Sequence, residues 1–148
     1  MKFTKKTRYG FQALIDLSVN MKDGPVALNS IAERNHISLQ YLEQVFAGLR
    51  RAGIVKSMKG SQGGYQLKEE ADRITAAMIV RALEGDYHIE GLKEMPEDGM
   101  PEMEKTIQDL LTDKINEKLD QVLENLTLED MRQYYLEYGK GCRDMYYI

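Results

Sequence analysis

The chain has 148 residues, of which 43% are hydrophobic and 30% are charged. This length and composition suit one compact core, and argue against two fully independent domains and against global disorder. The longest apolar runs are far shorter than a membrane helix, and no apolar signal core follows the basic first residues. We therefore expect a cytoplasmic protein without membrane contact.

The net charge of −4 conceals two halves of opposite sign. Residues 1–82 carry 13 Lys and Arg against 7 Asp and Glu, which gives +6, whereas residues 83–148 carry 7 against 17, which gives −10. The basic half suits contact with a polyanion, and the acidic half suits a different task. The single cysteine, Cys142, excludes an internal disulfide and fits a reducing compartment.

Helical spacing of apolar residues predicts a first helix over 8–21, which ends at the stop signal Asp23-Gly24-Pro25. A short helix is predicted over 28–35. After a turn at His36-Ile37, Ser38 is a good N-cap for a third helix that runs to about Ala52. Gly53 ends that helix.

The apolar pattern then changes to strict alternation. Residues 54–59 and 65–67 are predicted strands, and the glycine-rich segment 60–64 between them is a flexible tip. Thr75 is predicted to cap a helix over 76–84. The stretch 86–101 contains two prolines, two glycines and several acids, so it is predicted to be a linker or mobile loop.

The acidic half is dominated by a predicted amphipathic helix from Met103 to Leu126. Thr127 and Asp130 form a capping-box pattern for a last helix to about Tyr138. The apolar stripe of the long helix is longer than a domain of about 80 residues needs as cover, so a symmetric partner is the economical explanation. The residues expected to pair two copies are Ile107, Leu111, Ile115, Leu119 and Val122.

Two short helices, a tight turn and a hairpin within some forty residues are typical of a winged helix-turn-helix. Ala32 supplies the small residue needed where the two helices cross, between the apolar anchors Ile31 and Leu42. The predicted fold class is mainly α: a winged helix-turn-helix with a small β-hairpin wing, plus a long C-terminal dimerisation helix. The predicted domains are 1–85 for DNA binding, 86–101 as linker, and 102–148 for dimerisation and the tail.

Polar side chains on the third predicted helix have the chemistry that reads base edges. Gln pairs with adenine and Glu accepts from the cytosine amino group, while Arg and Lys of the helix end and wing suit phosphates. The glycine-rich tip follows no nucleotide-binding spacing, and no set of catalytic or metal-binding residues is apparent, so we expect no enzyme. The predicted DNA-contacting residues are Ser38, Gln40, Tyr41, Glu43, Gln44, Arg50, Arg51, Lys56, Lys59 and Ser61.

Several motifs resemble the Rrf2 family of bacterial regulators. They include Ser30-Ile31-Ala32-Glu33-Arg34, the run from Ile37 to Phe46 with its Tyr-Leu-Glu-Gln sequence, and Gly63-Gly64-Tyr65. The resemblance covers about residues 2–85 and implies a homodimer, a palindromic double-stranded operator and repression as the usual outcome. It places Gln40, Glu43 and Gln44 where the family reads bases. Lys59 stands where the wing often inserts an arginine.

One departure from the family pattern bears on cofactors. Cluster-binding members carry three cysteines in the loop before the long helix, but residues 86–103 contain none, and His88 alone cannot hold an iron–sulfur cluster. One cysteine and the two histidines, His36 and His88, also fall short of a zinc site. We therefore expect neither a cluster nor another metal cofactor.

The C-terminal Tyr147-Ile148 resembles the family branch that controls cysteine metabolism. In that branch a terminal Tyr-Ile enters the active site of cysteine synthase, so these two residues are predicted to bind a partner enzyme. Packing of this aromatic end on the dimer is an equal alternative. Direct sensing of a small molecule, a redox switch at Cys142, or a protein-interaction adaptor without DNA binding are further alternatives.

Overall fold

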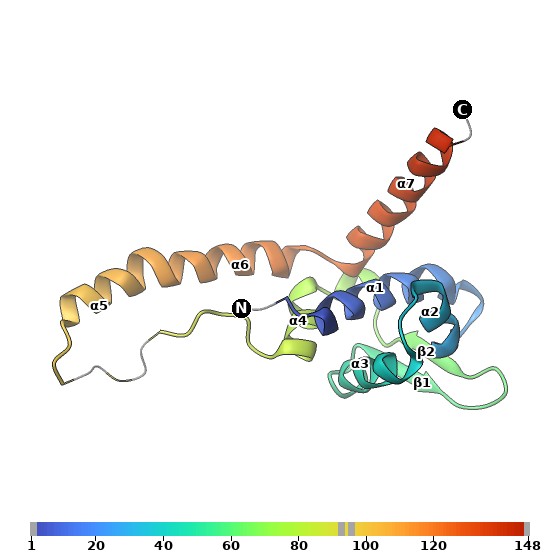
Figure 1. Ribbon diagram of the computed structural model, residues 1–148, viewed down its shortest axis with the longest axis horizontal. Helices are drawn as coiled ribbons and strands as arrows, with labels where there is room; N and C mark the ends of the chain where they lie inside the picture. Colours follow the sequence, from blue (N-terminus) through green and yellow to red (C-terminus); the bar gives the residue numbers. More distant parts are fainter. Residues whose placement is uncertain (1–2, 92–93, 95–96, 147–148) are drawn as a thin grey trace.

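The computed structural model describes residues 3–91, 94 and 97–146, the side chains of 140 and 142–146 excepted. The N-terminal half contains four helices and a hairpin, and the C-terminal half is helical (Figure 1). The elements are α1 (Lys5–Asn20), α2 (Leu28–Asn35), α3 (Leu39–Arg51), β1 (Val55–Met58), β2 (Gly64–Leu67), α4 (Ala76–Glu84), α5 (Pro101–Ile107), α6 (Asp113–Asn125) and α7 (Leu128–Tyr146).

The core lies where the apolar sides of α1, α2, α3 and α4 meet. Leu14 of α1, Ile31 of α2 and Phe46 of α3 are fully buried there. Helix α1 begins at Lys5, three residues before the predicted start. The hydroxyls of Thr4 and Thr7 both donate to the carboxylate of Glu84 at the end of α4, which ties the first turn of α1 to α4.

The wing is an antiparallel pair in which Val55 faces Leu67 and Met58 faces Gly64. Its second strand also pairs with the connection between α1 and α2. Tyr65 exchanges two backbone hydrogen bonds with Val26, of 2.8 and 2.9 Å. This third partner anchors the second strand of the wing, which would be marginal as an isolated two-stranded ribbon.

The long helix predicted over 103–126 is present as α5 and α6, joined by a π-helical turn over Gln108–Thr112. Pro101 occupies its first turn, as expected for a residue with no amide hydrogen to satisfy. In Figure 1 this rod extends past the N-terminal domain, with α5 at its far end. Leu119 and Leu123 of α6 pack against α4, where Leu123 is buried.

The chain returns to the N-terminal domain directly after α6. The amide of Ala76 donates to the carbonyl of Leu126, and the amide of Leu128 donates to that of Ile74, both at 2.8 Å. Leu128 is fully buried in the core of the winged helix-turn-helix. The end of α6 is therefore fixed to the N-terminal domain on both sides of Thr127.

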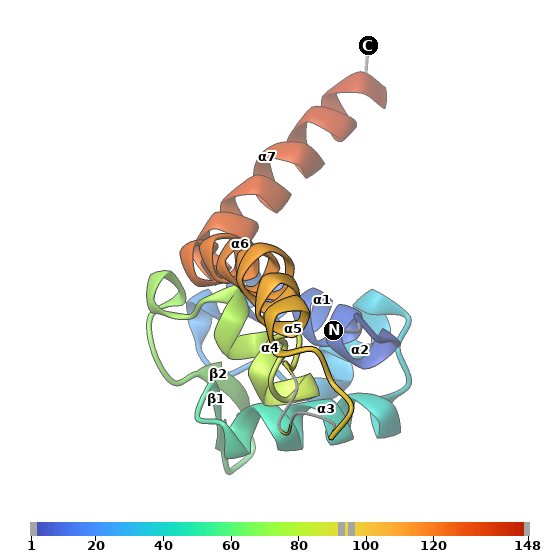
Figure 2. The ribbon, with the colours of Figure 1, turned by 90° about the vertical axis from the view of Figure 1, so that its left-hand side faces the viewer.

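The predicted capping box at the start of α7 is confirmed. The amide of Thr127 donates to the Asp130 carboxylate at 3.0 Å, and the amide of Asp130 donates to the Thr127 hydroxyl at 3.1 Å. Helix α7 runs to Tyr146, well past the predicted end near Tyr138, because two glycines weaken a helix without breaking it. Its first turns pack on α1, and the remainder points away from the domain (Figures 1 and 2).

Candidate nucleic-acid interface

The turn between α2 and α3 sets the angle of the second helix. His36 adopts the left-handed conformation, with φ 55° and ψ 40°, and its amide bonds back to the end of α2. Ile37 is buried beneath the turn. Ser38 then caps α3, as predicted, by accepting a hydrogen bond from the amide of Tyr41 at 3.2 Å.

Helix α3 separates into a buried and an exposed side. Leu42, Val45 and Leu49 are buried in the core. Tyr41, at the edge between the two sides, is half-buried. Six other residues predicted to contact DNA are exposed: Ser38, Gln40, Glu43, Gln44, Arg50 and Arg51. No hydrogen bond holds the side chains of Gln40 or Gln44 among the described contacts, so both amides are open to an external partner.

The wing presents the remaining predicted residues, Lys56, Lys59 and Ser61, all of which are exposed. Its tip is closed by a hydrogen bond of 3.0 Å from the amide of Gly63 to the carbonyl of Gly60. In the second strand, the ring of Tyr65 meets Phe46 of α3 edge to face, with centroids 4.9 Å apart. The wing is thus packed against the same helix that carries the polar side chains.

The two parts of the interface lie on one side of the molecule. Figure 2 shows α3 and the β1–β2 hairpin along the lower side, with α7 pointing away above. Helix α3 contacts β1 directly. Between Val55 and Lys68 the sequence has no acidic residue, so the wing adds only positive charge to this surface.

Two contacts that hold α1 against the helix-turn-helix, one to α3 and one to α2, were not predicted from the sequence. The rings of Tyr41 and Tyr9 meet edge to face, with centroids 5.6 Å apart, so α1 supports the exposed side of α3. In addition, Asp16 of α1 accepts hydrogen bonds from Arg34 at 2.7 and 3.0 Å and from Asn35 at 3.0 Å. These pairs join residues far apart in sequence, and their spacing follows no local pattern that could have revealed them.

The residues predicted for dimerisation differ in their exposure to solvent. Four of them, Ile107, Leu111, Ile115 and Val122, are exposed, and Val122 is 62% accessible. Leu119 is half-buried because it packs against the small apolar cluster of α4 and α6 in its own chain. The predicted partner-binding residues Tyr147 and Ile148 lie outside the described residues.

The described residues do not provide a metal site. Within them, no group of three or more His, Cys, Asp and Glu side chains is arranged to hold a metal ion. His36 is an exposed turn residue. The Nε2 atom of His88 lies 2.7 Å from a carboxylate oxygen of Asp120, so this ring is engaged in a contact within the protein.

This arrangement defines a winged helix-turn-helix transcriptional regulator, and not an enzyme. Residues 3–134 match the model of the Rrf2 family, described as an iron-dependent transcriptional regulator. The chain belongs to the Rrf2 family. The family description mentions iron, but the residues that the structure describes contain no group of three or more His, Cys, Asp and Glu side chains that could bind an iron ion.

Relatives and solved structures agree with this family. The chain is 41% identical to the HTH-type transcriptional regulator CymR of Bacillus subtilis over 90% of this chain and 91% of the relative. It is 35% identical to the HTH-type transcriptional regulator IscR of Erwinia tasmaniensis, over 88% and 78%. The solved structure of CymR, the global cysteine regulator of B. subtilis, superimposes with a TM-score of 0.74 at 40% identity, covering 90% and 98%.

None of the helices in the described part of the chain is both long enough and apolar enough to cross a membrane.

Proposed function

We propose that two copies of this chain bind a palindromic operator and repress transcription, with α3 of each copy in a major groove and the wing along the adjacent minor groove. The observation that carries the proposal is the separation of apolar and polar side chains onto opposite sides of α3. Leu42, Val45 and Leu49 are buried. Gln40, Glu43 and Gln44 are exposed on the side that also presents the wing. Glutamine and glutamate in the first turns of such a helix can reach base edges.

The positively charged side chains around α3 suit contact with the phosphate backbone of DNA. Arg50 and Arg51 stand at the C-terminal end of α3, and Lys56 and Lys59 extend from the wing, all exposed. Such contacts orient a protein on DNA without reading sequence, and they release counterions. Affinity supplied by four cations should therefore fall steeply as salt rises.

The dimer is proposed on the exposed apolar side of α5 and α6. Leu111 and Val122 are more than half exposed there, which is costly for a helix in a monomer. A second copy that packs its own α6 against this side would bury both stripes by symmetry. Such a pair would place two recognition helices about 34 Å apart, one turn of DNA.

We further propose that the regulator works without a metal cofactor. The whole chain has one cysteine, which is too few to ligate an iron–sulfur cluster. The one histidine in the region before α5, His88, contacts Asp120. A preparation made anaerobically with iron and sulfide should therefore bind operator with the same affinity as one treated with chelator.

Control of cysteine metabolism through a partner enzyme is the regulatory proposal. It is supported by the similarity to CymR, whose solved structure is that of a global cysteine regulator, and by the Tyr147-Ile148 tail. Helix α7, which leads to the tail, points away from α3 (Figure 2). A partner held there would leave the DNA-binding side accessible. Deleting Tyr147 and Ile148 should abolish binding to cysteine synthase.

The decisive experiment selects bound duplexes from a random pool and then measures affinity for the selected sequence. We expect a palindrome with half-site centres one turn apart, and an affinity that falls about 10³-fold or more from 50 to 200 mM salt. A selection that returns no palindrome, or binding that is insensitive to salt, would instead favour the adaptor alternative.

A further inference from the structure

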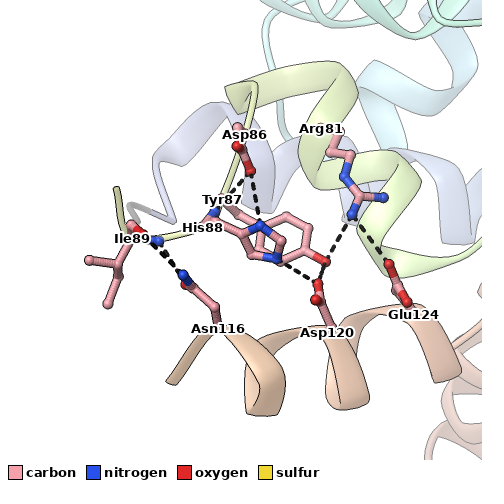
Figure 3. Close-up of polar contacts among 8 residues, drawn as sticks. All are labelled: Arg81, Asp86, Tyr87, His88, Ile89, Asn116, Asp120 and Glu124. Carbon is pink, nitrogen blue, oxygen red and sulfur yellow. Dashed lines mark hydrogen bonds and ion pairs between the residues drawn. The ribbon is translucent and has the colours of Figure 1, made fainter. Parts of the chain in front are cut away.

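The segment after α4 holds α6 through a compact set of polar contacts, shown in Figure 3. The hydroxyl of Tyr87 donates to the carboxylate of Asp120 at 2.5 Å, and the Nε2 atom of His88 contacts the same oxygen at 2.7 Å. The side chain of Asn116 bonds both the amide and the carbonyl of Ile89, at 2.8 and 3.0 Å. We call Tyr87, His88, Ile89, Asn116 and Asp120 the latch.

The N-terminal domain anchors the latch. The ring of Tyr87 is 1% exposed and packs among Ala76, Ala77 and Val80 of α4. Arg81 of α4 donates to the Tyr87 hydroxyl at 3.1 Å, and its guanidinium lies 4.9 Å from the centre of the Tyr87 ring. A phenol that is buried and bonded in this way cannot change position without losing several contacts.

The latch adds to other attachments of α6, which include the packing of Leu119 and Leu123 on α4 and the Arg81–Glu124 ion pair. Among these contacts it lies farther from the C-terminal end of α6 than the ion pair does. The backbone pairing at Leu126 and Leu128 fixes that end of the helix. At a rise of about 1.5 Å per residue, Asp120 lies about 9 Å from Leu126 along the helix, and Ile107 lies about 28 Å from it. A shift of about 1 Å at Asp120 would therefore move the end of α5 by about 3 Å.

We infer that the latch sets the direction of the proposed dimerisation helix relative to α3, and so makes Tyr87 and Asp120 positioning residues for the spacing of DNA half-sites. The inference rests on the proposed function, because spacing matters only if two copies bind one operator. It adds to that function the residues that fix the geometry. Neither residue is expected to contact DNA, since Tyr87 and Asp120 meet between α4 and α6 (Figure 3), and Figure 2 shows α6 on the opposite side of α4 from α3.

Two variants remove the central hydrogen bond from opposite ends. Tyr87→Phe keeps the buried ring and removes the donor, and Asp120→Ala removes the half-exposed acceptor without opening the core. Tyr134→Phe, which removes a hydroxyl from an exposed tyrosine of α7, is the matched control. Far-ultraviolet circular dichroism and thermal melting establish that each variant is folded.

The first readout is the distance between the two wings of a dimer. A spin label on Gln62→Cys in a Cys142→Ser background gives one label per copy, at the exposed tip of the wing. We expect one narrow distance distribution for the parent and the Tyr134→Phe control, and a distribution about twice as wide for both latch variants. A merely structural hydrogen bond would lower the melting temperature and leave this width unchanged.

The second readout is affinity for unlabelled palindromes. Both latch variants should bind the selected palindrome about tenfold more weakly, if about one dimer in ten keeps the matching spacing, and should bind a single half-site unchanged. They should also discriminate less against palindromes lengthened by one base pair. If the latch variants keep the narrow distribution and the spacing preference of the parent, the inference is wrong and the proposed function stands. If the parent itself shows no paired labels and no palindrome binding, the proposed function fails first.

Discussion

At the residue scale, Gln44 is the most direct test of base recognition. Its side chain is exposed on α3, two turns from the Ser38 cap. Gln44→Ala should lower affinity for the selected operator by about 1–3 kcal/mol and relax the preference at one base pair of each half-site. Competition binding against all single substitutions of a half-site measures this.

The matched control for Gln44→Ala is Gln133→Ala, an exposed glutamine on α7. It should leave both affinity and preference unchanged. Lys59→Ala should instead weaken every sequence alike, since an exposed lysine on the wing contacts phosphate rather than bases. Base preference that survives Gln44→Ala would show that α3 is not the helix that reads the operator.

The hydroxyl of Tyr87 provides a test in the alkaline range. Burial raises the pKa of Tyr87 to about 12, and the hydrogen bond to Asp120 acts in the same direction. Because the folded pKa is above the unfolded value of about 10, this group stabilises the fold fully below pH 10. That stabilisation is lost as pH rises from about 10 through about 12.

Spectrophotometric titration of phenolate absorbance measures the ionisation directly. The difference between the parent and Tyr87→Phe should contain one step near pH 12, if the protein is still folded there by circular dichroism. Urea midpoints of the parent should approach those of Tyr87→Phe as pH rises above 10. A difference step near pH 10 would mean that the hydroxyl is open to solvent.

The exposed residues of α3 were predictable because helical spacing separates them from Leu42 and Val45 within a single element. The cap at Ser38 was also local. The contacts of α1 with α2 and α3 were not predictable in this way, because Asp16 meets Arg34, and Tyr9 meets Tyr41, only after α1 folds onto these two helices. Placement of the predicted DNA-contacting residues on DNA stays a prediction.

At the element scale, the wing depends on a glycine where its second strand begins, next to the tip. Gly64 has φ +156°, and a Cβ built there would lie 2.4 Å from the carbonyl oxygen of Val26. The backbone of Val26 cannot move aside, since it pairs with Tyr65. Gly64→Ala should therefore cost about 2 kcal/mol or more, from the strained φ together with the contact.

Gly60→Ala is the control for Gly64→Ala, because Gly60 also has a positive φ, +113°, but no atom within 4 Å of the added Cβ. It should cost only about 1 kcal/mol. Urea unfolding of both variants measures the difference. Equal costs would mean that the pairing of the wing with Val26 contributes little to its position.

Caps and periodicity made most elements predictable. The cap at Thr75 and the capping box at Thr127 and Asp130 are both present. The π turn over Gln108–Thr112 was not predicted, because it requires only a small change of helical phase that leaves the apolar spacing nearly intact. The structure departs most from the sequence-based expectation at the start of the predicted linker. Residues 86–89 are held by α6 through contacts between groups some thirty residues apart.

At the scale of the whole molecule, charge and architecture agree. The basic half forms the side with α3 and the wing, and the acidic half forms the rod of α5 and α6 and the start of α7. An acidic rod placed on DNA would be repelled, so the division favours one orientation of approach. The sequence could not show that the chain returns to the N-terminal core at Leu128. A single leucine that is buried by distant parts of the chain leaves no pattern in the residues around it.

The proposed dimer leads to a prediction for Val122, which is 62% exposed on α6. Val122→Glu should leave the fold of a single copy intact, because a charge at an exposed position stays in water. In the dimer the same carboxylate would be buried against an apolar surface, which costs about 2–4 kcal/mol per copy. Dimer association should therefore weaken at least about 100-fold, as measured by sedimentation velocity across a range of concentrations.

The control for Val122→Glu is Gln121→Glu, which adds the same charge at the neighbouring exposed position. Adjacent residues on a helix point about 100° apart, so this carboxylate should lie beside the apolar stripe rather than within it. Gln121→Glu should remain dimeric and bind the full palindrome. If both variants dimerise like the parent, the contact between copies is elsewhere, and the exposed side of α6 then needs another partner. If both dissociate, the contact extends around α6 beyond the stripe, and the two recognition helices would be held by a broader surface than the five predicted residues.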